Sequence, residues 1–189
     1  MITFLIVSNT VRSSTKKSLK SVVGGQERFD VLARCLLNLD RWKKRLNTDL
    51  NLVFYLSHPE EQVVLELPLK ILTSTLEGEQ ASIIQLVNIF DRPESFGLNF
   101  ERISFNKLLL RIIKTSSIYY LTPNGKPIND VITKSLFDSD LCFILGSQND
   151  LSEDQETIIQ EFEFTPTSLG QLDYLASHVI TIICQNLDV

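Results

Sequence analysis

The stretch Leu141-Cys-Phe-Ile-Leu-Gly146, followed further along the chain by Thr167-Ser-Leu-Gly170, decides the fold. The first is a short apolar run that ends at a glycine, which is typical of a strand buried on both faces. The second is a loop of small residues before the long apolar segment 172–182. Where such a strand and such a loop lie close together, backbone amides are available to hold a polar ligand.

Other segments of the chain repeat this alternation of buried strands and amphipathic helices. Further strands are expected at Thr3–Val7, Leu52–Leu56 and Ile118–Leu121, with Val63–Leu67 as a weaker candidate. Helices are expected at Phe29–Leu39, Ala81–Phe90, Phe105–Thr115 and Asp130–Leu136. In the first helix, one apolar stripe comprises Phe29, Leu32, Cys35, Leu36 and Leu39. The alternation predicts an α/β fold whose mostly parallel sheet has helices on both faces.

The last part of the chain predicts two more helices. Ser152 and Gln155 have the Ser-x-x-Gln spacing of a capping box, so a helix is expected to start there and run towards Phe162. The final helix is expected to begin soon after Gly170 and to end near Asn186. Its inner side is expected to carry Leu172, Leu175, His178, Val179 and Ile182.

Length and composition indicate one ordinary globular domain spanning residues 1–189. Hydrophobic residues make up 43% and charged residues 22% of the chain, and no linker-like boundary interrupts it. No apolar run reaches the ~20 residues needed to cross a bilayer, and the first residues lack the basic flank of a secretory signal. A membrane partner is therefore not expected.

The few cysteines and histidines do not predict a metal site. The three cysteines, Cys35, Cys142 and Cys184, are widely spaced and odd in number, so buried thiols in a reducing cytoplasm are the expectation. The two histidines, His58 and His178, are isolated in sequence, and the second is expected to be a hydrogen-bonded, buried residue of the last helix. Neither a phosphate-loop nor a dinucleotide-binding glycine pattern occurs.

Charge is distributed unevenly along the chain, whose formal net charge is −5. Residues 1–45 hold ten lysines and arginines against three acidic residues, a charge of +7, whereas residues 46–189 hold eight against twenty, a charge of −12. A basic surface that meets phosphates is one interpretation, and a solvated helix face is the other. The residues in question are Arg12, Lys16, Lys17, Lys20, Arg41, Lys43, Lys44 and Arg45.

Together with Thr3-Phe-Leu-Ile-Val7 and Arg28-Phe-Asp-Val-Leu-Ala-Arg34, the two stretches quoted first resemble the archaeal tRNA pseudouridine-54 N1-methyltransferases of the SPOUT class. The resemblance runs nearly end to end and is patchy between about residues 60 and 115. It implies a trefoil-knotted fold and S-adenosyl-L-methionine as cofactor. It also implies a structured RNA, above all tRNA, as substrate, and a homodimer whose active site is completed near the last helix.

The same resemblance assigns residues to a cofactor pocket at the two turns. Carried over by position, these residues are Leu121, Gly146, Thr167, Ser168, Leu169, Gly170 and Leu175. Core packing is the alternative for each of the three leucines, and an ordinary turn is the alternative for each glycine.

A second set of residues is implied to act on the nucleoside. Asp30 is implied to accept the N1 proton or to orient the base, while Arg28 and Arg34 are implied to hold phosphates or favour the developing negative charge. The alternative is an ordinary ion pair, because Asp30 and Arg34 are four residues apart on one helix face.

The chain departs from the family pattern in two places. Archaeal members continue the loop after the Gly146 strand as Asp-His-x-Gly, where this chain has Ser147-Gln-Asn-Asp150, and they have a cysteine where this chain has Val179. Two rival hypotheses therefore accompany the methyltransferase assignment. One is an RNA-binding or regulatory protein without turnover, and the other is a methyltransferase for another RNA nucleoside, such as one in rRNA.

Overall fold

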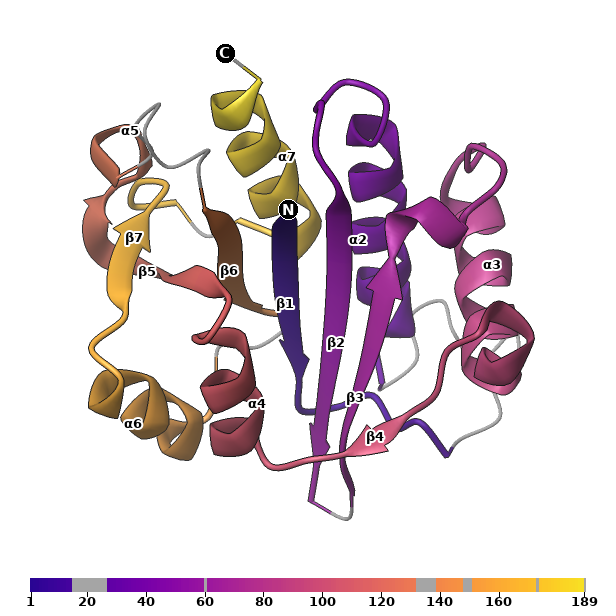
Figure 1. The fold of residues 1–189 in the computed structure, drawn as a ribbon, viewed down its shortest axis with the longest axis horizontal. Coiled ribbons are helices and arrows are strands. Elements are labelled where there is room, and N and C mark those ends of the chain that lie inside the picture. Colours follow the sequence, from indigo (N-terminus) through magenta and orange to yellow (C-terminus); the bar gives the residue numbers. More distant parts are fainter. Residues whose placement is uncertain (15–26, 60, 132–138, 148–150, 173, 189) are drawn as a thin grey trace.

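A seven-stranded sheet forms the centre of the computed structural model, which describes residues 1–14, 27–59, 61–131, 139–147, 151–172 and 174–188 (Figure 1). The strands lie in the order β4-β3-β2-β1-β6-β5-β7. The β1–β2, β1–β6, β5–β6 and β5–β7 pairs are parallel, and the β2–β3 and β3–β4 pairs are antiparallel. The strands are β1 Ile2–Ser8, β2 Leu50–His58, β3 Glu61–Pro68, β4 Glu101–Arg102, β5 Ser116–Pro127, β6 Asp140–Gly146 and β7 Thr165–Ser168.

Helices cover both faces of this sheet. The α-helices are α2 Phe29–Trp42, α3 Glu79–Asp91, α4 Phe105–Ile112, α5 Ile128–Val131, α6 Glu153–Glu161 and α7 Ala176–Leu187, with short 3₁₀ turns η1 Leu69–Ile71 and η2 Pro93–Phe96. Alternate residues of β1 point to opposite faces, so Phe4 and Ile6 join the core beneath α2, α3 and α7, while Leu5 and Val7 join the core beneath α4 and α6. The expected α/β architecture is confirmed.

The strands and helices expected from apolar periodicity are found with small shifts of their ends. In α2, all five residues of the expected stripe are at most 1% exposed. The capping box at the start of α6 is also confirmed, because the Ser152 side chain accepts from Gln155 N and the Gln155 side chain accepts from Ser152 N. The expected helix over 130–136 is only partly testable, because residues 132–138 lie outside the described part of the chain.

Two strands were not expected, and both lie at the edges of the sheet. β7 has the sequence Thr-Pro-Thr-Ser and β4 has only two residues, both exposed, so neither forms an apolar run. Proline is tolerated in a strand where one side of the backbone faces no neighbour. Edge strands therefore escape a search for buried apolar runs.

The last helix begins later than expected and turns a different face inward. α7 starts at Ala176, and its buried residues are Ala176, Ser177, Val179, Ile180, Ile183, Cys184 and Leu187. Leu172 and Leu175, expected on the inner side, are 69% and 46% exposed, and His178 is also exposed. The expectation failed because it treated the segment before Ala176 as helical, which rotated the predicted face.

Parallel pairing brings the carboxyl ends of β1, β2 and β6 to the same side of the molecule, where these strands end. This side is called the carboxyl edge, and it is distinct from the edge strands β4 and β7. Ser147 N donates to Val7 O at 2.9 Å, so the pairing of β6 with β1 continues to this edge. In open α/β sheets, ligands bind beyond the carboxyl ends of the strands, where the connections diverge. The knotted path stays a prediction, because residues 148–150 and 173 lie outside the described residues.

Candidate functional site

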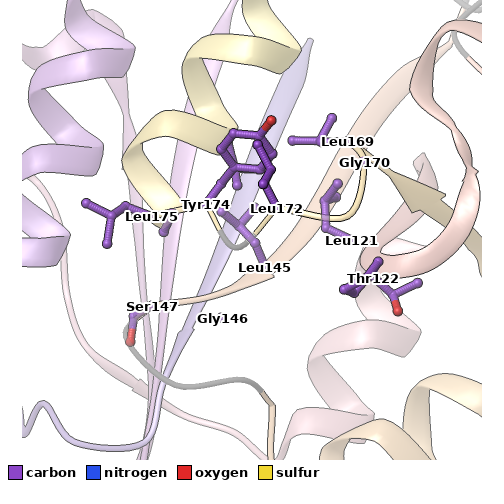
Figure 2. A pocket seen from close by; sticks show the side chains of 13 residues that line it. Leu121, Thr122, Leu145, Gly146, Ser147, Leu169, Gly170, Leu172, Tyr174 and Leu175 are labelled. Atoms are coloured by element: carbon purple, nitrogen blue, oxygen red, sulfur yellow. The ribbon is translucent and has the colours of Figure 1, made fainter.

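A cavity of about 560 Å³ lies at the carboxyl end of β6 and the middle of β5, next to the start of α7 (Figure 2). The turns that follow β6 and β7 both contribute to its wall, as the sequence predicted. Its lining residues are Leu121, Thr122, Pro123, Leu145, Gly146, Ser147, Leu169, Gly170, Leu172, Tyr174, Leu175, Ala176 and Val179. The two turns therefore meet around one cavity.

The wall contributed by β5 and β7 depends on a close approach of two backbones. β5 pairs with Thr167 of β7 twice, through Leu121 and again through Lys126, and the chain between them bulges out to the cavity. A Cβ atom at Gly125 would lie 2.5 Å from Thr167 N, so only glycine fits there. This contact holds the Thr122–Pro123 segment at the cavity.

Ser168 connects the two segments that form this wall. Its hydroxyl donates to Pro123 O at 3.0 Å and accepts from Gly170 N at 3.0 Å. Gly170 has a φ of +113°, a conformation that residues with a side chain rarely adopt. The turn after β7 is thus fixed by a side-chain bond and a glycine.

Five of the seven residues assigned to the cofactor line this cavity, namely Leu121, Gly146, Leu169, Gly170 and Leu175. Thr167 and Ser168 do not line it, since they are 0% and 7% exposed and support the wall from behind. The sequence did not point to Tyr174 or to Leu145, which only the tertiary arrangement brings to the cavity. Val179, one of the two departures from the family pattern, also lies in the wall.

Asp30 and its two arginines form a separate cluster at the start of α2. Asp30 is 5% exposed; its Oδ1 accepts from Arg28 Nε at 3.0 Å, and its Oδ2 accepts from Arg28 at 3.1 Å and from Arg34. Arg28 precedes the helix with a φ of 49°, a left-handed conformation that is costly outside glycine. Strained residues of this kind are concentrated at functional sites.

The electrostatics of this cluster favour the charged carboxylate. Burial of Asp30 opposes ionisation, but the hydrogen bonds and positive charges of Arg28 and Arg34 outweigh it and lower the pKa of the carboxyl below its ordinary value. The same pairing raises the pKa of Arg28. At neutral pH, the cluster has one negative and two positive charges.

The Asp30 cluster does not line the cavity in the single chain, but it lies on a helix that contacts the cavity wall. Asn38, one turn beyond Arg34 on α2, donates to Ser177 O at 2.7 Å. Ser177 lies between Ala176 and Val179, both of which line the cavity. The structure therefore brings the two predicted sets to neighbouring elements.

The basic residues of the N-terminal quarter that the structure describes do not form one surface. α2 runs away from the carboxyl edge, so Arg41 and residues 43–45 lie at the opposite end of the molecule from Arg12. Lys43 Nζ donates to Leu72 O at 2.9 Å, Lys44 Nζ lies 3.2 Å from Thr75 Oγ1, and Arg45 stacks over Trp42. Lys16, Lys17 and Lys20 lie outside the described residues. Among the five of these eight residues that the structure describes, Arg12 is separate from the others, and a basic surface that includes the remaining three stays a prediction.

The three cysteines are not placed for nucleophilic chemistry. All three cysteines are buried, and burial raises the pKa of each thiol to about 12, so the thiols stay protonated at neutral pH. Within the part of the chain that the structure describes, no group of three metal-ligating side chains occurs and no helix is long and apolar enough to span a bilayer.

Comparison with known proteins places this chain in a family. Residues 1–189 match the family described as "Putative SAM-dependent RNA methyltransferase", and the chain belongs to that family. A relative from Thermococcus kodakarensis, named tRNA (pseudouridine(54)-N(1))-methyltransferase, is 28% identical over 196 residues, which cover 97% of this chain and 96% of the relative. A relative of the same name from Methanococcus vannielii is 28% identical over 197 residues, covering 98% and 97%.

The fold is also that of a solved structure, Archaeoglobus fulgidus Nep1 bound to S-adenosylhomocysteine. The TM-score is 0.60 at 11% sequence identity, and the match covers 98% of this chain and 96% of that chain. At this identity, the likeness concerns the fold.

Proposed function

We propose that this protein transfers a methyl group from S-adenosyl-L-methionine to N1 of a pseudouridine in tRNA. The observation that carries the proposal is the cavity where the turns after β6 and β7 meet, in a chain that belongs to a family of SAM-dependent RNA methyltransferases. The nucleoside and the RNA come from the names of the relatives in Thermococcus and Methanococcus.

The cavity suits this cofactor in size and in chemistry. A volume of about 560 Å³ falls within the range of ~300–1,000 Å³ usual for small-molecule sites. Leu121, Leu145 and Leu169 offer apolar walls for a flat adenine, and the backbone at Gly146 and Gly170 is accessible to its polar edge. None of the described lining residues is charged, so nothing among them repels a sulfonium. When bound there, the cofactor supplies an electrophilic methyl group.

The Asp30 cluster is proposed to hold the nucleoside and its phosphates. Both carboxylate oxygens of Asp30 are already bonded to arginines, and a lowered pKa makes a carboxylate a poor proton acceptor. This favours a positioning role for Asp30 over that of a general base. In this proposal, Arg28 and Arg34, held by Asp30, bind phosphate and stabilise negative charge as N1 loses its proton.

A homodimer is part of the proposal. Leu172, Tyr174 and Leu175 are 69%, 37% and 46% exposed at the rim of the cavity, and such an apolar cluster is typical of an interface. A second copy that covers this rim would exclude water from the cavity. Light scattering of the purified protein tests this, and Leu172→Glu is expected to shift a dimer towards monomer.

The test of the function is made in two measurements. Calorimetry is expected to detect binding of S-adenosyl-L-methionine to the purified protein. Mass spectrometry of tRNA nucleosides from cells with and without the gene is expected to find N1-methylpseudouridine only where the gene is present. A protein that neither binds the cofactor nor changes the nucleosides would contradict the proposal.

Two departures in this region motivate alternatives that the same experiments separate. Ser147 begins the altered loop and Val179 replaces the cysteine of archaeal members, and both line the cavity. Cofactor binding without any methylated product would indicate an RNA-binding or regulatory protein, and a different missing nucleoside would name another substrate. The three free cysteines support a reducing compartment such as the cytoplasm.

A further inference from the structure

A second cavity, of about 320 Å³, opens at the other side of the carboxyl edge, where β2, β3 and β4 meet the segment after β1. We refer to it as the arginine cavity. Its lining residues are Arg12, Ser13, Ser14, His58, Glu61, Val63, Phe100 and Arg102. The described lining thus combines two arginines, one glutamate and two serines with the apolar Val63 and Phe100.

Among the described lining residues of the arginine cavity, Glu61 is the one carboxylate, and its hydrogen bonds hold part of the wall together. Glu61 Oε2 accepts from Ser13 N at 3.1 Å, and Glu61 Oε1 accepts from the Ser13 hydroxyl. These two bonds fasten the segment after β1 to the start of β3, which places Arg12 beside the end of β2. Glu61 therefore holds two parts of the cavity wall together through its hydrogen bonds to Ser13.

Strand alternation directs Arg102 into the arginine cavity. Its neighbour Glu101 pairs with Arg111 of α4 at 2.6 Å, on the other face of the sheet. Side chains two residues apart share a face, and Phe100 and Arg102 accordingly both line the cavity. Within the described residues, Arg102 forms no ion pair and is exposed. An arginine without an acidic partner beside two hydroxyl groups is suited to a bound anion.

The arginine cavity lies on the same edge of the molecule as the predicted cofactor pocket. Three strand spacings, roughly 14 Å, separate β6 from β3. Packed aromatic rings connect the start of α2 to the arginine cavity. The ring centroids of Phe29 and Phe90 are 4.9 Å apart, and those of Phe90 and Phe100 are 5.2 Å apart. Arg28 directly precedes Phe29, so the Asp30 cluster and Arg102 belong to one side of the molecule.

We infer that the arginine cavity binds a backbone phosphate of the RNA substrate, next to the nucleotide that enters the methyl-transfer site. This inference rests on the proposed function. Arginine and serine side chains are common donors to phosphate oxygens, and contacts of this kind fix the register of a nucleic acid. In a chain of net charge −5, cations gathered at the reacting edge direct the polyanion to that edge. Val63 and Phe100 provide apolar surface for the adjoining sugar or base.

The test compares Arg102→Gln with Arg45→Gln, which removes the same charge at the far end of α2. Affinity for an unmodified tRNA transcript is measured as a function of salt, with cofactor binding measured alongside. For Arg102→Gln, we expect affinity to fall on the order of tenfold and the salt slope to shrink by roughly 0.7 to 0.9, the loss of one phosphate contact. Arg45→Gln and the cofactor affinity of both variants are expected to match the wild type.

Arg102→Lys separates a phosphate contact from a merely structural role. Lysine keeps the charge but not the paired donors, so we expect the salt slope to return while part of the affinity loss remains. Inorganic phosphate, tested as a competitor, is expected to weaken RNA binding less in Arg102→Gln than in the wild type.

The outcomes distinguish the site from the function. If wild-type protein methylates tRNA and Arg102→Gln binds RNA with unchanged affinity and slope, the arginine cavity is not a phosphate site and the proposed function stands. If the wild type binds the cofactor but neither binds nor methylates RNA, the proposed function fails. In that case an RNA phosphate is also ruled out as the occupant of the arginine cavity.

Discussion

Helix α2 has a buried aspartate near each end, and the two are held by different partners. Among the described residues, the carboxylate of Asp30, in the first turn, accepts only from arginines close in sequence, Arg28 and Arg34. Asp40, in the last turn, is 2% exposed and accepts the backbone N–H of Leu76 at 2.8 Å, with Lys43 Nζ 3.1 Å from Oδ1 without hydrogen-bond geometry.

The difference separates a carboxylate that stabilises the fold from one that positions two arginines. Asp40 joins α2 to a segment 36 residues away, so its loss would leave a buried backbone donor without a partner. Among the described residues, the Asp30 carboxylate reaches no distant segment and holds Arg28 and Arg34 at the carboxyl edge. Arg34 Nε also lies 3.5 Å from Glu79 Oε1 at the start of α3. The same residue type on one helix therefore stabilises the fold at one end and concentrates charge at the other.

Asp30→Asn is expected to give the largest effect on turnover. The amide keeps the size of the side chain but no longer fixes both guanidinium groups, so methyl transfer should fall by at least ~100-fold. Cofactor affinity, measured by calorimetry, should be unchanged because the cluster does not line the cavity. Turnover equal to that of the wild type would remove Asp30 from the mechanism.

The same variant should also change the acid limb of stability. Because the pKa of Asp30 is lowered in the folded protein, its charge stabilises the fold above the unfolded value of about 3.9, and this contribution is lost as pH falls through the folded pKa. Chemical unfolding from pH 6 to pH 2 should therefore show a flatter acid limb for Asp30→Asn. An identical limb would contradict the ion pairing.

Asp40→Asn is expected to act on stability and to spare turnover. Removing the charge from a buried, paired carboxylate should lower the free energy of unfolding by about 1–3 kcal/mol. Urea unfolding measures the loss, and turnover per folded molecule should remain near that of the wild type. If Asp40→Asn kept its stability but lost turnover, Asp40 would belong to the catalytic machinery and not to the fold's support.

Ser168→Ala should give a smaller effect, confined to the cofactor. Loss of the bonds to Pro123 O and Gly170 N loosens the wall without removing a lining residue. A typical hydrogen bond contributes about 1 kcal/mol, so cofactor affinity should fall about fivefold. Calorimetry measures the cofactor affinity. Thr157→Ala, at an exposed position of α6, is the matched control for the loss of a hydroxyl and should leave that affinity unchanged.

Reversing charge at the far end of α2 should give the smallest effect. Lys44→Glu and Arg45→Glu change exposed residues remote from both cavities, where surface charges contribute less than about 1 kcal/mol. RNA affinity at physiological salt, measured by filter binding, should change less than about twofold. A loss comparable to that of Arg102→Gln would move the RNA footprint to this end.

Elements dominated by local signals could be predicted from the sequence. The apolar runs of β1, β2 and β6, the buried stripe of α2 and the capping box of α6 all lie in contiguous residues, and local chemistry decides them. The start of α7 was missed because Leu172 and Leu175 continue an apolar spacing without being helical. β7 was missed because an edge strand with a proline has no apolar run.

The sequence by itself determined the class of fold, the family and the two turns where a ligand is expected, because these depend on runs of adjacent residues. Only the tertiary structure decided which side chains line the cavity, since Tyr174 is turned to its wall and Thr167 away from it. It also decided that the basic residues lie apart. Helix α2 has 14 residues and is therefore about 21 Å long, so basic residues that precede it and those that follow it lie at opposite ends of the helix.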